Sequence, residues 1–248
     1  MAATDNLTSL HDHEEELRSR SLAVIKADAA LSDHWDLVAE AMNAIYAFSH
    51  DHPHGSEDEL TLQYLGIRLF NAAGVSVKLA LSGYYQKAFD QVRDVIETYF
   101  LVDYLSTYPD EIDEWKRADR KKLTWYFSPA RIRNELDKRD RYTSGERTRI
   151  YRLISEAASH ASYRGISLMA TGPDNLVQVG PFFDENKLKV WMNEMAIRLS
   201  HAAIVLTSNP EGIDLQLLNT RTHYLEVCNE WWSKYRRMKP QAASPASA

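Results

Sequence analysis

Apolar residues recur every three or four positions along most of the chain, which is the period of an amphipathic α-helix. In the clearest case, a helix expected over residues 84–106 gathers its apolar side chains on one face: Tyr85, Phe89, Val92, Ile96 and Tyr99. The same spacing predicts further helices over residues 17–48 (with a break near 31–33), 57–81, 110–122, 128–140, 146–162, 184–207 and 211–239. The pattern therefore predicts an all-α fold, a multi-helix bundle.

Two helix starts carry capping residues. Ser56 is followed three positions later by Glu59, the arrangement of a capping box. Ser128 precedes Pro129, which is tolerated at the first helical position because its missing N–H has no partner there. Both features predict where a helix begins.

One stretch departs from the helical period. Two short β-prone runs, residues 166–171 and 176–179, flank a Gly-Pro-Asp-Asn sequence typical of a turn. We expect a small β-hairpin inserted in the bundle near residues 166–179. Residues 1–239 are expected to form a single helical domain, and the Pro-, Ala- and Ser-rich residues 240–248 a disordered tail.

The composition is that of a folded globular protein. Of the 248 residues, 44% are hydrophobic and 26% are charged. The longest stretch without Asp, Glu, Lys or Arg covers 12 residues, 199–210, whereas a membrane-spanning helix needs about 20. A single cysteine, Cys228, excludes an internal disulfide and a Cys-based zinc cage. With no secretion signal at the acidic start of the chain, we expect a cytoplasmic protein without a membrane partner.

Charge is unevenly distributed along the chain. The net charge is −6, but residues 116–152 hold 13 basic and 5 acidic residues, a net +8. Residues 1–66 hold 13 acidic and 3 basic residues, a net −10. Two interpretations are open. The basic segment contacts a polyanion such as RNA, or it docks on the acidic N-terminal half, within one chain or across a dimer.

Residues 146–162 carry the first candidate site. At 100° per residue, Arg149, Arg152, Glu156 and His160 fall in one sector beside the apolar face. Histidine moves protons and arginine offsets phosphate charge, so the candidate catalytic residues are His160, Arg152 and Glu156, with Arg149 binding phosphate. The alternative is a surface ladder of ion pairs.

Arg93 and Glu97 form the second candidate. They lie at i and i+4 on the 84–106 helix and are expected to form a structural polar pair. Asp103 projects from the apolar stripe of the same helix, so it also needs a partner. Arg93, together with Lys121 and Lys122 of the basic segment, is a candidate phosphate-binding residue.

A third candidate is a run of alternating histidines, His50, His52 and His54. Imidazole nitrogens in that arrangement could bind a metal ion. The run lies in a predicted loop without a rigid surrounding shell, so no metal is assigned to it. No phosphate-binding glycine loop or nucleophile elbow occurs, and no cofactor is assigned.

Two segments bear a family resemblance. Residues 81–88 with Arg93 and Glu97, and later residues 151–160, are similar to uncharacterised bacterial bundle proteins that look like the HEPN class (higher eukaryote and prokaryote nucleotide-binding domains). The resemblance covers about residues 59–232. It implies a four- or five-helix bundle, frequent dimerisation and, in some members, metal-independent RNA cleavage in toxin–antitoxin and phage-defence systems. The nuclease form has four to six residues between its arginine and histidine, whereas seven separate Arg152 from His160.

These observations leave two functions open. The first is a HEPN-like helical protein that binds or cleaves RNA in phage defence or stress response, as a metal-independent ribonuclease if it is an enzyme. The second is a non-catalytic helical homo-oligomer that acts as an interaction or regulatory module.

Overall fold

The computed structural model describes residues 3–160, 162–172, 174, 176–208 and 210–236. It confirms the predicted all-α bundle with one small β-hairpin. The elements in chain order are α1 (Ala3–Ala27), α2 (Ala29–Tyr46), the π-helical turn η1 (Ala47–Asp51), α3 (Glu57–Leu81), α4 (Tyr85–Thr107), α5 (Glu111–Lys116), α6 (Arg120–Trp125), α7 (Pro129–Asp140), α8 (Glu146–Ile154), the π-helical turn η2 (Ser155–Ser159), the 3₁₀-helix η3 (Tyr163–Leu168), β1 (Ala170–Thr171), β2 (Leu176–Val177), α9 (Glu185–Leu206) and α10 (Leu215–Tyr235).

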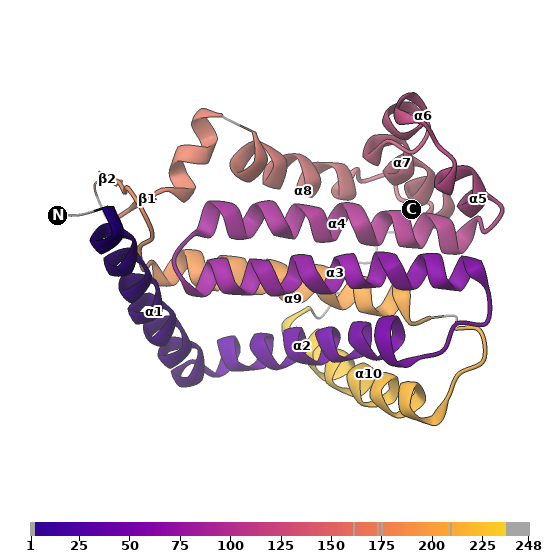
Figure 1. Cartoon of the computed structure of the whole chain (residues 1–248), viewed down its shortest axis with the longest axis horizontal. Coiled ribbons are helices and arrows are strands. Elements are labelled where there is room, and N and C mark those ends of the chain that lie inside the picture. The colour runs from indigo at the N-terminus through magenta and orange to yellow at the C-terminus, as the bar shows by residue number, and fades with distance from the viewer. Residues whose placement is uncertain (1–2, 161, 173, 175, 209, 237–248) are drawn as a thin grey trace, which may run out of the picture.

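The long helices form the body of the molecule. In Figure 1, α2, α3 and α4 run side by side, α9 lies behind them and α10 crosses beside α2. Helix α1 extends obliquely at one end. Helices α7 and α8 pack on the outer side of α4, and α5 and α6 lie beside α7 at the opposite end from α1. The inner helices position α4 so that its outer face supports the basic segment.

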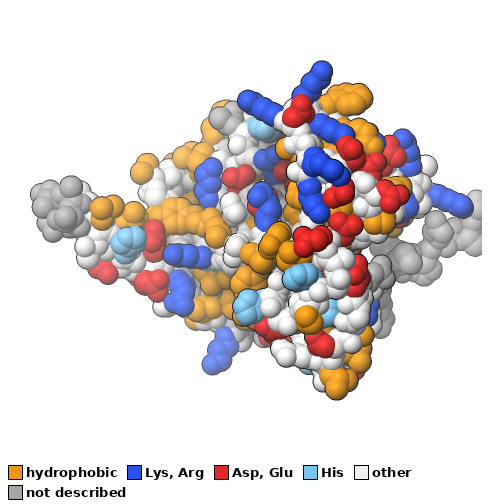
Figure 2. Space-filling model, turned by 45° about the vertical axis from the view of Figure 1, so that its right-hand side comes forward, with side chains coloured by type: hydrophobic (Ala, Val, Ile, Leu, Met, Phe, Trp, Pro, Cys, Tyr) orange, Lys and Arg blue, Asp and Glu red, His pale blue; other side chains and the backbone are white. Residues whose placement is uncertain are grey.

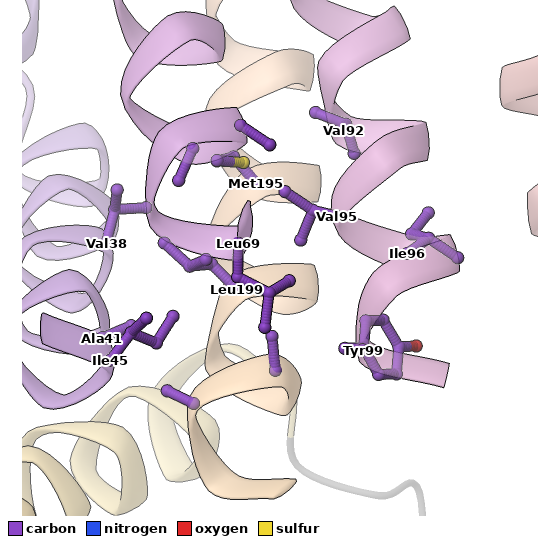
Figure 3. Close-up of a cluster of buried hydrophobic side chains, with 14 of the residues drawn as sticks. Val38, Ala41, Ile45, Leu69, Val92, Val95, Ile96, Tyr99, Met195 and Leu199 are labelled. Carbon is purple, nitrogen blue, oxygen red and sulfur yellow. The ribbon is translucent and has the colours of Figure 1, made fainter. Parts of the chain in front are cut away.

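The core lies where α3, α4 and α9 meet α2. Figure 3 shows Val95 of α4 pointing toward Leu69 of α3 and Leu199 of α9, and all three belong to the buried core. Two buried polar side chains here are paired, as the low dielectric of an interior favours. The Trp191 indole N–H donates to Ser76 Oγ (3.0 Å), and the Ser76 hydroxyl donates to the Ala88 carbonyl (2.8 Å).

Both predicted helix starts are confirmed. The Ser56 hydroxyl accepts the Glu59 backbone N–H at 3.1 Å. Ser128 Oγ accepts the Arg131 backbone N–H, with Pro129 in the first turn. These side-chain oxygens satisfy N–H groups that the first turn of a helix leaves unpaired.

Three predicted boundaries are wrong, and side-chain caps explain them. The break in the 17–48 helix falls at Asp28, whose carboxylate accepts the N–H groups of Ala30 and Leu31. The 110–122 helix is divided because Asp119 caps a new helix, α6. The last helix begins at Leu215 and not near 211, because Asp214 caps it. Residues 237–239 and the predicted tail, 240–248, lie outside the described residues.

The region between α8 and α9 also differs from prediction. The expected 146–162 helix ends at Ile154 and continues as the π-helical turn η2. The first half of the expected first strand, residues 166–168, is instead part of the 3₁₀-helix η3, which Ser162 caps by accepting the Gly165 N–H at 3.3 Å. The hairpin keeps only two residue pairs, Ala170 with Val177 and Thr171 with Leu176. Short apolar runs do not distinguish a strand from a helical turn, which accounts for the error.

Two glycines of α3 differ in how closely neighbouring side chains pack against them, so we expect substitution by alanine to have opposite effects. A Cβ at Gly66 would overlap Ser49 Oγ and lie 2.8 Å from Leu206 Cδ2, whereas a Cβ at Gly74 would meet only Met42 Cε, at 4.0 Å. We expect Gly66→Ala to lower the free energy of unfolding by about 1–3 kcal/mol through overpacking. Gly74→Ala should raise it by about 0.5–1 kcal/mol through helix propensity. Urea unfolding of both variants tests this, and equal effects would contradict it.

Candidate nucleic-acid interface

The basic segment folds into four short helices, α5 to α8, which we call the basic cap (residues 111–154). The cap covers one end and the outer side of α4. Figure 2 shows Lys and Arg side chains crowded in the upper part of the view, where these helices lie, with Asp and Glu among them. The basic segment is thus gathered on one part of the surface.

Acidic partners of the cap come mainly from the cap itself. Arg117 pairs with Asp113 (2.8 Å), and Arg149 with Glu146 (2.7 Å). Among the described ion pairs of residues 116–152, only Lys116 Nζ to Asp58 Oδ1, at 3.6 Å, reaches the acidic residues 1–66. Among the described residues, ion pairing between the basic segment and residues 1–66 of the same chain is therefore limited to this contact.

Four cations of the cap keep free side chains. In the described part of the chain, the side chains of Arg120, Lys121, Arg141 and Arg152 are exposed and form no hydrogen bond or ion pair. Trp125 lies on the same cap and is 76% exposed. Of the predicted phosphate-binding residues, Lys121 is thus available, whereas Lys122 pairs with Glu114.

The continuous helix on which Arg152, Glu156 and His160 were expected to share one face is interrupted. Helix α8 ends before Glu156, and the π-helical turn rotates the following side chains out of register, with the His160 N–H bonded to the Ser155 carbonyl five residues back. Glu156 pairs with Arg164 at 2.6 Å. His160 is exposed, and within the described residues its ring makes no hydrogen bond. Among the described residues, no hydrogen bond or ion pair joins Arg152, Glu156 and His160 to one another.

The predicted Arg93–Glu97 pair is confirmed, and it belongs to a larger cluster between α4, α7 and α8. Arg93 Nη2 lies 2.8 Å from Glu97 Oε1, and the Tyr151 hydroxyl donates to the same oxygen. The Arg133 guanidinium stacks on the Tyr151 ring, 3.9 Å from its centroid. Arg133 is only 5% exposed and its Nε and Nη1 have no partner, so burial lowers its pKa. The sequence pattern identified neither Tyr151 nor Arg133.

Asp103 has the partner that its position required. The Arg139 guanidinium makes a bidentate contact with it, at 2.5 and 3.0 Å, and also contacts Asp140. Arg147 in turn bridges Asp137 (2.6 Å) and Asp140. This network joins α4, α7 and α8. Hydrogen bonds from Arg139 and Arg147 hold the pKa of the Asp140 carboxyl below its usual value.

The three predicted histidines have different surroundings. His52 is buried, and its Nδ1 lies 3.1 Å from Asp214 Oδ2, which ties the loop after α2 to the start of α10. His50 is exposed beside Asp51, and His54 is exposed. Among the described residues, no cluster of His, Cys, Asp or Glu has the geometry to hold a metal ion.

Comparison of the chain with known protein families, with curated proteins and with solved structures gives no match. In the part of the chain that is described, no helix is both long enough and apolar enough to cross a membrane. The surface of the basic cap is therefore the feature of the described residues on which a function can be proposed.

Proposed function

We propose that the protein is a non-catalytic helical protein that binds RNA through its basic cap. The observation that carries this proposal is the set of free, exposed cations beside an exposed tryptophan. Free lysine and arginine side chains neutralise backbone phosphates without first breaking an internal ion pair. Trp125 and the exposed Tyr142 offer aromatic faces for stacking of unpaired bases. Single-stranded RNA suits both features.

The proposal excludes cleavage because proton transfer needs an oriented acid or base. Among the described residues, His160 has no partner that would fix its ring, and Glu156, its expected neighbour, is paired with Arg164. The resemblance of α4 and α8 to HEPN proteins supports RNA as the polyanion. A role in phage defence or stress response follows from the same resemblance.

Fluorescence anisotropy of labelled single-stranded RNA, measured over a range of salt concentrations, tests the proposal. Each phosphate contact contributes about 0.7 to the slope of log K against log salt concentration for a single strand. Arg120→Ala/Lys121→Ala should therefore reduce the slope by about 1.4. The matched control, Lys26→Ala/Lys87→Ala, removes two exposed cations outside the cap and should leave the slope unchanged.

Two outcomes contradict the proposal. Equal slopes for the cap variant and the control would show that Arg120 and Lys121 of the cap do not contact RNA phosphates. Shortened RNA after incubation with wild-type protein, absent with His160→Ala, would restore the catalytic interpretation.

Self-association is a second candidate function, favoured by one observation. Residues 1–66 keep a net charge of −10 while a single described ion pair joins them to the basic segment. Each stretch could therefore neutralise its counterpart in a second chain. Absence of RNA binding, together with a dimer mass at low salt that falls to a monomer mass at high salt, would favour this candidate.

A further inference from the structure

A groove lies between α8, the last helix of the basic cap, and α9, and none of the four free cations of the cap lines it. Both helices pack on α4, and the space between them measures about 590 Å³. We call it the α8–α9 groove; its lining is Phe89, Glu146, Arg149, Ile150, Leu153, Ile154, Ala157, Leu168, Val190, Glu194, Ile197, Arg198, Trp232 and Arg236. Its volume is in the range of small-molecule sites.

Most of the lining is apolar, and two of its large side chains are open to solvent. Leu153 and Val190 are 55% and 57% exposed, although large side chains of this kind are usually covered. Trp232 adds an aromatic face. A concave apolar surface of this kind favours a ligand with an apolar body.

A second cavity of about 330 Å³ adjoins the groove. It shares Glu146, Ile150 and Arg198 with the groove and extends to Tyr99 and His201.

The charged lining has one cation in excess. Arg149 pairs with Glu146 at 2.7 Å, and Arg198 with Glu194 at 2.9 Å. Arg236, the third arginine, has no acidic partner among the described residues and reaches only Asn193 Oδ1, at 3.4 Å. An acidic group on a ligand would supply the partner that Arg236 lacks.

We propose that the α8–α9 groove binds a small amphipathic acid, with an apolar body against Ile150, Ile197 and Trp232 and one acidic group at Arg236. This site uses none of the free cations assigned to RNA, so it goes beyond the proposed function.

A matched pair of fluorescent probes tests the proposal. 1-Anilinonaphthalene-8-sulfonate and N-phenyl-1-naphthylamine share an apolar body, but only the first carries an acidic group. We expect the sulfonate to bind one molecule per folded chain and more tightly than the neutral probe. Dodecanoate should displace it, whereas dodecanol should not. Equal affinity for both probes would overturn the selectivity for an acid.

Variants locate the site. Arg236→Gln should weaken sulfonate binding by about fivefold, near the upper range for an exposed ion pair, and leave the neutral probe unaffected, while Arg236→Lys should restore binding. Leu153→Glu should abolish sulfonate binding, and the control Leu123→Glu, on an exposed leucine outside the groove, should not. Unchanged binding in Leu153→Glu would overturn the location. A wild-type dimer that Leu153→Glu dissociates would instead identify a second copy as the occupant.

Discussion

Replacing Arg147 by Met is expected to lower the free energy of unfolding by about 3 kcal/mol, as for removal of one partner from a buried ion pair. The Arg147 side chain is 17% exposed and bridges Asp137 and Asp140, which are 16% and 23% exposed. Without the guanidinium, both carboxylates remain largely shielded from water, and only Asp140 retains a cation, Arg139. The loss therefore reflects carboxylate charge left without compensation.

Arg149→Met is the matched control for this prediction. It removes an arginine of the same helix from an ion pair of similar length, but the Arg149 and Glu146 side chains are 66% and 51% exposed. Exposed pairs contribute about 0–1 kcal/mol because water screens them. Urea unfolding of both variants at neutral pH gives the comparison, and losses of similar size would contradict a special role for Arg147.

The helical pattern predicted most of the fold because burial of one helix face repeats along the chain. Residues 84–106 show this: Val92 and Ile96, on the predicted apolar face, are buried in the structure. The errors in helix boundaries occur where a single side chain caps a new helix although the hydrophobic pattern continues. Asp28 and Asp119 each offer a carboxylate to backbone N–H groups, which begins a new helix inside a continuous hydrophobic period.

Only one part of the candidate site was predicted, the pair of residues that lies on a single helix. Arg93 and Glu97 are four residues apart on one helix, so their contact follows from helix geometry alone. Tyr151 joins them from 54 positions away, and Arg133 from another helix. Only the packing of α7 and α8 on α4 brings these residues together. Spacing along one sequence does not encode such contacts.

The uneven charge distribution predicted where the basic segment lies but not which of its cations are free. A count of charged residues along the sequence does not show which ion pairs form within the segment. Local acids neutralise Arg117, Arg147 and Arg149, and this leaves Arg120 and Lys121 free. The number of cations available to a polyanion is thus set by the structure of the cap. For the same reason, Arg236 becomes a candidate for binding an acid only once Arg198 and Arg149 are seen to be paired.

Acidification is expected to destabilise the protein through His201. Burial, together with the nearby charges of Arg198 and Arg147, lowers the pKa of His201 from 6.5 to about 4. Its ring stacks near Trp232, with 5.2 Å between centroids, and faces Tyr99 of α4. Between these two pKa values the unfolded chain binds a proton that the folded chain does not, so stability falls as the pH decreases. At about 1.4 kcal/mol per unit, the loss is about 2 kcal/mol from pH 7 to 5 and about 3 kcal/mol by pH 4.

His201→Gln isolates this contribution, because other groups also titrate in the range. His34 is one of them, since burial lowers its pKa as well. Urea unfolding at pH 7, 6, 5 and 4.5 should show that the wild-type protein loses stability faster than the variant. The control, His223→Gln, replaces a histidine whose side chain is 62% exposed, and it should follow the wild-type curve. Parallel curves for the wild-type protein and His201→Gln would show that His201 takes up its proton equally in both states. In that case the acid sensitivity of the fold would have to come from His34 or the paired carboxylates.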